Sequence, residues 1–140
     1  PDFRTESSEA FQITSTWSER HAAYACGLGT FGLCDGLITP VGKAVRFGTV
    51  VTEARITPDE RPYTNYREYC LFAADGSCGE CIDRCPTGAL SEKGHDKGLC
   101  KAYLRDVTAH HVENEYKFKG YGCGLCQTGI PCESGIPERP

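Results

Sequence analysis

The sequence lacks several features that define common classes of protein. It contains no methionine and one tryptophan, and nothing in it approaches the run of about 20 apolar residues that a transmembrane helix requires. Its formal net charge is −4, so a general role in binding nucleic acid or a membrane surface has no support. No secretory signal peptide is recognisable. We therefore expect a cytoplasmic protein that neither spans a membrane nor binds nucleic acid.

Cysteine, in contrast, is abundant. The 140 residues, which suit one domain or two closely joined halves, contain ten cysteines. Three interpretations compete: a disulfide scaffold, zinc sites and iron–sulfur clusters. The absence of a signal peptide favours a reducing compartment, where disulfides are rare. The spacing of the cysteines has to decide between the other two.

The cysteines divide the chain into two parts. Residues 1–66 contain only Cys26 and Cys34, and residues 67–140 contain the other eight. The division falls in a polar stretch, residues 57–65, that carries two prolines. Neither Cys26 nor Cys34 has a partner at ligand spacing, so we expect both to be small buried residues, with a redox-active thiol at Cys34 as the alternative.

A helix is predicted near the start of the chain. Thr16-Trp17-Ser18-Glu19 is typical of a capping box, with Thr16 as the N-cap and the Glu19 carboxylate three residues later. The helix should then run to about Cys26 and stop at Gly27, because glycine readily adopts the left-handed conformation found after helix ends.

Three further elements are predicted from pattern and composition. Residues 44–52 alternate in the manner of a strand, and residues 37–39 are a shorter strand candidate. Residues 99–107 favour a short helix with Asp96 as its N-cap. The glycine-rich and proline-rich segment from Gly120 onward should take its shape from a metal centre rather than from apolar packing.

The most specific motif is C-x2-C-x3-C-P at residues 78–86. Bacterial ferredoxins with two clusters carry C-x2-C-x2-C-x3-C-P, in which the fourth cysteine binds the other cluster. This chain keeps the last three cysteines and the proline. Cys70 can supply the first ligand if residues 71–77 loop around the cluster. The motif therefore predicts a 4Fe–4S cluster and, through its last cysteine, a second one.

The remaining cysteines complete two sets of four. A cubane cluster needs thiolates at four corners, because soft sulfur ligands suit iron–sulfur cores. If the ferredoxin cross-over rule applies, the first cluster takes Cys70, Cys78, Cys81 and Cys132, and the second takes Cys85, Cys100, Cys123 and Cys126. Cys132 is the least regular of these ligands. Five residues separate it from the preceding cysteine where three are common, and Glu133 follows it instead of proline.

Zinc and disulfides remain as alternatives. C-x2-C pairs also build zinc ribbons, so a structural zinc-binding module stays open. The Cys-Pro after the x3 spacing and the isolated Cys70 and Cys100 fit zinc poorly. Disulfides fit less well still, because the two cysteines of a C-x2-C pair rarely bridge each other in a structural disulfide.

A glycine motif in the first part invites a different interpretation. Residues 27–32 satisfy G-x-G-x-x-G, and Glu53 lies at about the distance of the acidic residue in a dinucleotide site. That fingerprint requires a strand before the glycines and a helix after them, whereas a helix is predicted before them here. We therefore expect the glycines to allow a tight connection and a close approach of the backbone to another group.

Residues 15–137 resemble the family of epoxyqueuosine reductases and reductive dehalogenases, and in particular its relatives described only as double-cluster 4Fe–4S proteins. The specific parts are A-C-G-L-G-T-F-G at residues 25–32, L-I-T-P-V-G at residues 37–42, and the order of the cysteines. Members of this family place a cobalamin-binding fold beside a ferredoxin-like module with two clusters. The cluster nearer the cobalamin supplies electrons to cobalt.

The resemblance implies an α+β fold with two parts. Residues 1–66 would be a partial α/β segment from the edge of the cobalamin-binding reductase fold, and residues 67–140 a ferredoxin-like double 4Fe–4S domain. It also implies that Gly27, Gly29 and Gly32 belong to the edge of a cobalamin pocket. Glu19 would stand where epoxyqueuosine reductases carry an acidic residue near the substrate, a candidate proton donor. The capping box offers a simpler role for Glu19.

The resemblance is compatible with two functions. The family's upstream half, which supplies most of the cobalamin fold, is absent from these 140 residues, and the chain begins at Pro1, so we expect part of a longer or split polypeptide. For the chain as given, the favoured function is an oxidoreductase component that transfers electrons to a redox partner or to a missing catalytic domain. The alternative is a cobalamin-dependent reductase of the epoxyqueuosine or dehalogenase type.

Overall fold

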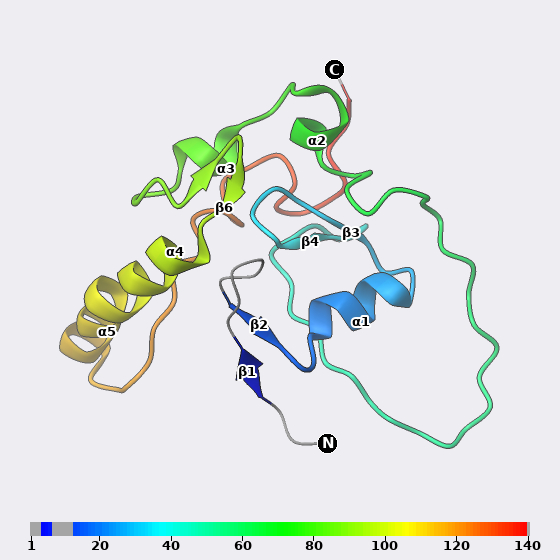
Figure 1. Ribbon diagram of the computed structural model, residues 1–140, viewed down its shortest axis with the longest axis horizontal. Coiled ribbons are helices and arrows are strands. Elements are labelled where there is room, and N and C mark those ends of the chain that lie inside the picture. The colour runs from blue at the N-terminus through cyan, green and yellow to red at the C-terminus, as the bar shows by residue number, and fades with distance from the viewer. Residues whose placement is uncertain (1–3, 7–12, 140) are drawn as a thin grey trace.

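The computed structural model describes residues 4–6 and 13–139 (Figure 1). Short helices alternate with three two-stranded antiparallel sheets within this part of the chain. The expected mixture of α and β structure is confirmed at this level. A helical arm projects on one side, and a long connection without regular structure forms the other side (Figure 1).

The N-terminal elements are a short hairpin and one helix. Strand β1, Thr5–Glu6, pairs with β2, Thr14–Ser15, and α1 follows at Glu19–Ala25. The predicted N-cap is wrong by two residues: the Ser18 side chain, not that of Thr16, accepts the hydrogen bond from a helix N–H. Glu19 is therefore the first residue of the helix and not the third. Gly27, at φ +81°, follows the helix end as predicted.

A second hairpin carries the glycine motif. Strand β3, Thr30–Phe31, pairs with β4, Leu37–Ile38, which confirms the predicted strand apart from its last residue. The hairpin connection, residues 32–36, is closed by a hydrogen bond from the Gly32 N–H to the Gly36 carbonyl at 2.8 Å. Gly29 has no room for a side chain, because a Cβ there would lie 2.1 Å from the Ile38 carbonyl oxygen. The expected close approach of the backbone is confirmed at this position.

The predicted strand at residues 44–52 is wrong. These residues adopt no regular structure, and Val50 and Val51 are 86% and 90% exposed. The alternation of side chains was present, but no strand lies alongside to accept the backbone hydrogen bonds in the described part of the chain. A strand needs a partner, and local pattern cannot supply one.

The cysteine-rich part is built from short elements. Helices α2, Leu71–Asp75, and α3, Glu80–Asp83, precede a hairpin of β5, Leu90–Ser91, and β6, Gly94–His95. A continuous helical arm follows as α4, Lys97–Tyr103, the π-helix η1, Leu104–Thr108, and α5, Ala109–Tyr116. Asp96 caps α4 as predicted, but the arm extends nine residues beyond the predicted end at residue 107. The chain then returns without regular structure beside α2 and α3 (Figure 1).

One hydrophobic core joins the two parts of the sequence. Its buried members come from the β3–β4 hairpin and from the cysteine-rich region: Leu33, Cys34, Ile38, Cys70, Cys81, Leu90 and Ile130. Tyr69, Phe72 and Ile82 pack against this group. The core thus surrounds cysteines instead of a sheet. None of the helices in residues 4–6 and 13–139 is long and apolar enough to cross a membrane.

Candidate functional site

Four cysteines line a first cavity at the centre of the core. Cys70 precedes α2, Cys78 and Cys81 lie before and within α3, and Cys132 comes from the returning C-terminal segment. Apolar residues close the cavity around them: Ile38, Leu71, Phe72, Ile130, Pro131 and Pro137. Cys70 and Cys81 are buried and the other two are partly buried. The volume is about 20 Å³.

Four other cysteines line a second cavity, together with Cys34. Cys85 follows α3, Cys100 lies in α4, and Cys123 and Cys126 come from the returning segment. This cavity is larger, at about 250 Å³, and its walls include Tyr103, Leu104 and Tyr121. Cys123 is exposed and the other three are partly buried. The two cavities therefore group the eight cysteines in the same two sets as the cross-over rule. Their role as ligands stays a prediction.

Local backbone geometry explains how neighbouring cysteines reach different cavities. The α3 helix ends at Asp83 with Arg84 as its C-cap, and the Cys85 N–H donates to the Ile82 carbonyl at 3.0 Å. Pro86 cannot continue a helix, so Cys85 leaves α3 toward the second cavity while Cys81 stays in the first. In the returning segment, Gly124 adopts φ +87° between Cys123 and Cys126. This left-handed turn lets both sulfurs line the same cavity.

The pKa values of the thiols reflect their burial. Desolvation raises the pKa of Cys81 to about 11 and also raises that of Cys132. The hydrogen bond with Cys34, followed by burial, raises the pKa of Cys126. These thiols are therefore protonated at neutral pH when no metal is bound. Binding of a metal group must release their protons, as is general for thiolate sites.

Cys34 and Lys43 form a buried pair between the cavities. The Lys43 ammonium lies 3.4 Å from the Cys34 sulfur, and the Cys34 thiol donates to the Cys126 carbonyl at 3.4 Å. A hydrogen bond from the Cys126 side chain, followed by the Lys43 charge, lowers the pKa of Cys34 to about 5 against the effect of burial. Burial by itself would lower the pKa of Lys43, but the charges of Cys34 and Cys132 raise it. Cys34 is buried, as expected, but the same expectation for Cys26 is wrong, because Cys26 is exposed.

The donor sets fit thiolate-bound clusters. Each cavity presents four thiols, the soft ligands that iron–sulfur cores prefer. Within the described residues, no three His, Cys, Asp or Glu side chains converge on a point where one metal ion could bind.

Glu19 lies outside both cysteine-lined cavities. Its carboxylate accepts hydrogen bonds from Trp17 Nε1 at 3.2 Å and from the Thr49 hydroxyl. It lines a separate cavity of about 230 Å³, whose walls also carry three cations, Arg20, Lys43 and Arg46. A catalytic role for Glu19 stays a prediction. Glu19 is no capping-box residue, because the carboxylate's partners are side chains.

The three motif glycines serve close packing within this chain. Gly27 turns the chain after α1, and Gly29 contacts the backbone of Ile38. A Cβ at Gly32 would lie 2.8 Å from the Lys43 ammonium nitrogen. Their place at the edge of a cobalamin pocket stays a prediction.

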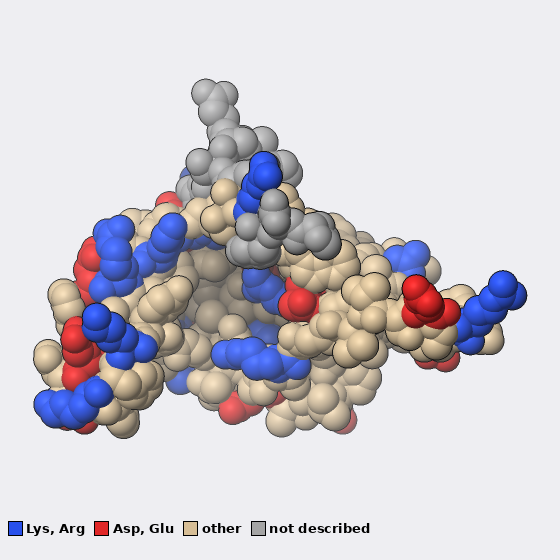
Figure 2. Space-filling model, turned by 90° about the horizontal axis from the view of Figure 1, so that it is seen from below, with Lys and Arg blue, Asp and Glu red and all other residues tan. Residues whose placement is uncertain are grey.

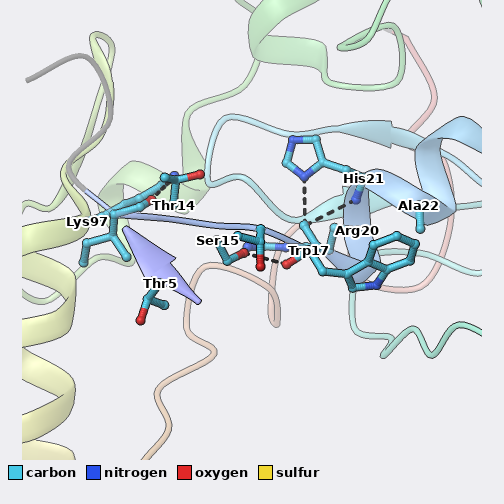
Figure 3. Close-up of a pocket in the computed structure, with 11 residues that line it drawn as sticks. Thr5, Thr14, Ser15, Trp17, Arg20, His21, Ala22 and Lys97 are labelled. Atoms are coloured by element: carbon cyan, nitrogen blue, oxygen red, sulfur yellow. Dashed lines mark hydrogen bonds between the residues drawn. The ribbon is translucent and has the colours of Figure 1, made fainter. Parts of the chain in front are cut away.

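A separate cavity has no cysteine among its described lining residues. It has a volume of about 580 Å³ and lies between β2 and the start of α1, where Figure 3 shows Trp17, Arg20 and His21 beside Thr14 and Ser15. Its cations already have partners: Arg20 donates to the Asp35 carbonyl at 2.6 Å, and the Lys97 ammonium lies 3.9 Å from the Asp35 carboxylate. Figure 2 shows a hollow face of the molecule with Lys and Arg side chains around it. This cavity has no evident connection to thiol chemistry.

Two features of the site were not predicted from the sequence. Lys43 is 3% exposed although it follows a proline-glycine turn, a context typical of solvent-exposed lysines. Asp35 joins the two parts of the chain, because its carboxylate contacts His95 at 3.1 Å and Lys97 at 3.9 Å. Both arise from contacts between residues far apart in the sequence, and no local signal announces them.

Comparison with known proteins agrees with the cysteine pattern. Residues 76–132 match the family model of the 4Fe-4S double cluster binding domain. The epoxyqueuosine reductase of Bacillus anthracis is 35% identical over 129 residues, which cover 88% of this chain and 31% of the relative. That of Listeria monocytogenes is 31% identical over 141 residues, covering 96% and 34%. An uncharacterized protein of Geobacillus stearothermophilus is 34% identical over 99 residues, covering 67% and 41%.

The chain spans about a third of the length of the curated epoxyqueuosine reductases that it matches. No solved structure matches it. The resemblance inferred from the sequence is thus confirmed, and so is the iron–sulfur character of the cysteine-rich part. Residues 76–132 therefore carry a 4Fe–4S double cluster binding domain, and the chain is similar over most of its length to part of the epoxyqueuosine reductases.

Proposed function

We propose that this chain is an electron-transfer module that holds two 4Fe–4S clusters and passes low-potential electrons to a partner protein or to a catalytic domain. The observation that supports this proposal best is the division of eight thiols between two cavities that are both lined by residues of one core. The clusters would supply one-electron chemistry at potentials of order −400 mV, as in ferredoxins.

The chain's own residues would hold and insulate the clusters. Cys70, Cys78, Cys81 and Cys132 would bind in the first cavity, and Cys85, Cys100, Cys123 and Cys126 in the second. The apolar wall of the first cavity would exclude water, which prevents water from replacing the thiolate ligands of the cluster. We expect the two clusters to lie close together, because α3 contributes to one cavity and Cys85, just after it, to the other.

Metal analysis tests the proposal directly. After anaerobic preparation, we expect about eight irons and eight acid-labile sulfides per chain, from two clusters of four each. Reduction by dithionite should produce the broadened EPR signal of two interacting reduced clusters. Zinc in place of iron, with no signal after reduction, would instead make the protein a structural zinc-binding module.

The relatives favour a second candidate. Because epoxyqueuosine reductases are about a third identical over most of this chain, the chain could contribute to a reductase of that type or of the dehalogenase type. Glu19 would then be a proton donor, and cobalamin would bind with the help of an upstream domain. Tight binding of added hydroxocobalamin, detected by absorbance, would support this candidate. Its absence would leave electron transfer as the function of this chain.

A further inference from the structure

The Lys43 ammonium is buried among sulfur atoms. Lys43 is 3% exposed and lines the first cavity with its four cysteines. Its Nζ donates to Cys34 Sγ at 3.4 Å, and its backbone N–H donates to the carbonyl of Cys132 at 2.8 Å. The residue is therefore held at the cavity wall at both its backbone and its side-chain end.

The β3–β4 hairpin leaves space for this side chain. A Cβ at Gly32 would lie 2.8 Å from Lys43 Nζ, and a Cβ at Gly36 would lie 2.8 Å from its Cδ. Neither glycine has a positive φ, so the backbone conformation does not demand glycine at these positions. What the two glycines provide is room for the lysine to cross the hairpin connection.

A buried ammonium needs negative charge close by. Removing a charge from water without a partner is costly, so buried charges in proteins are paired. Among the described residues, the ion pairs with carboxylates involve other cations, and Lys43 has none. The groups around Lys43 that can carry negative charge are thiols. Cys34 Sγ, 3.4 Å from the ammonium, can supply one such charge, and a thiolate-bound cluster in the first cavity would place a larger negative charge beside Lys43.

We propose that Lys43 is the counter-cation of the first cavity and raises the reduction potential of the 4Fe–4S cluster bound there. The inference rests on the proposed function. A cluster with four thiolates carries a charge of about −2 when oxidised and −3 after gaining one electron. Lys43 is positively charged in both states, and it attracts the reduced cluster more strongly than the oxidised one because the reduced cluster is more negative. The attraction is large because the site is poorly solvated. Reduction is therefore favoured.

The effect should be unequal between the two clusters. Lys43 lines the first cavity, whereas the wall of the second is lined by Cys34, the hydrogen-bond partner of the lysine. The second cavity is also larger and holds the exposed Cys123, so solvent screens charges there more strongly. Lys43 should thus separate the two midpoint potentials.

The experiment is a potentiometric titration followed by EPR on the anaerobic, cluster-loaded chain, with dithionite as reductant. Lys43→Gln should shift one of the two midpoints to a more negative value and move the other less. Lys101→Gln is the matched control, because it removes the same charge next to Cys100 at an exposed position. A Lys43→Gln variant that keeps about eight irons and unchanged midpoints would overturn the proposal.

A second pair of variants decides the question if Lys43→Gln does not retain its clusters. Gly32→Ala displaces the ammonium without removing it, and Gly48→Ala adds the same methyl group where nothing lies within 4 Å. A negative shift in Gly32→Ala alone supports the proposal, and equal midpoints in both variants overturn it. Failure of the proposed function is distinguishable, because the wild-type chain would then contain no iron.

Discussion

The two cysteine-lined cavities have the same donors and different surroundings. The first is narrow, is closed by apolar side chains and a buried lysine, and includes two buried cysteines. The second is larger and includes an exposed cysteine. Cluster potentials and lability depend on burial, charge and solvent access. Two chemically equal sites are therefore expected to behave as unequal redox centres.

The largest expected effect is selective loss of one cluster. Cys126→Ser should remove the cluster of the second cavity and leave the first, which halves the content from about eight irons to about four. Cys81→Ser should do the same for the first cavity. Iron and sulfide analysis with EPR measures both. If the two variants lose the same EPR component, or if neither loses iron, the division of ligands is wrong.

The difference in burial predicts unequal lability. In the wild-type chain, an iron chelator should remove the second cluster several-fold faster than the first, because its cysteines are the more exposed. Loss of iron followed by absorbance should have two phases. Cys81→Ser should retain only the fast phase and Cys126→Ser only the slow one. A single phase in the wild type would contradict the comparison.

A substitution at Asp35 tests how far residues 1–66 and residues 67–140 stabilise each other. Burial would raise the pKa of its carboxyl, but the hydrogen bond and charge of His95, with the charges of Lys97 and Arg20, lower it. Asp35→Asn should reduce the free energy of unfolding by about 1 kcal/mol, a decrease in Tm of about 3–5 °C. Asparagine tolerates the φ of +59° at this position, so the substitution isolates the charge.

The sign of that pKa shift sets the pH window. A carboxyl with a lowered pKa in the folded state stabilises fully above its ordinary range, and the contribution is lost as pH falls through the lowered value. The Tm difference should therefore be constant from about pH 7 to 9, well above an ordinary aspartate pKa of about 3.9. Asp106→Asn, in an exposed pair with Arg105, is the control that should leave Tm unchanged. A difference that grows with pH in this range would contradict the assignment.

The smallest expected effect is that of Cys34→Ala. Cys34 lines the second cavity but stands outside both sets of four, so its removal should leave about eight irons per chain. Loss of about four irons would show that Cys34, and not one of the assigned cysteines, is a ligand. The family match, residues 76–132, includes neither Cys34 nor Cys70, so it assigns neither of them as a ligand.

Local features of the fold were predictable where local energetics decide them. The helix N-cap at Asp96, the left-handed Gly27 and the strand at Leu37–Ile38 all follow from short-range chemistry. The strand at residues 44–52 failed because strands depend on partners. The N-cap is Ser18 and not Thr16, because serine is the better N-cap residue and its side chain accepts a hydrogen bond from the His21 N–H; the spacing of Thr16 and Glu19 outweighed this preference in the prediction.

The sequence by itself determined the class of chemistry, because cysteine spacing reports how thiols can be arranged around a metal group over a few residues. It also carried the resemblance to reductases that the comparisons confirm. Only the tertiary structure decided what surrounds the thiols: the burial of Lys43, the contact of Asp35 with His95, and the unequal size of the two cavities. These features depend on contacts across 9 to 92 residues of separation, and no local pattern encodes them.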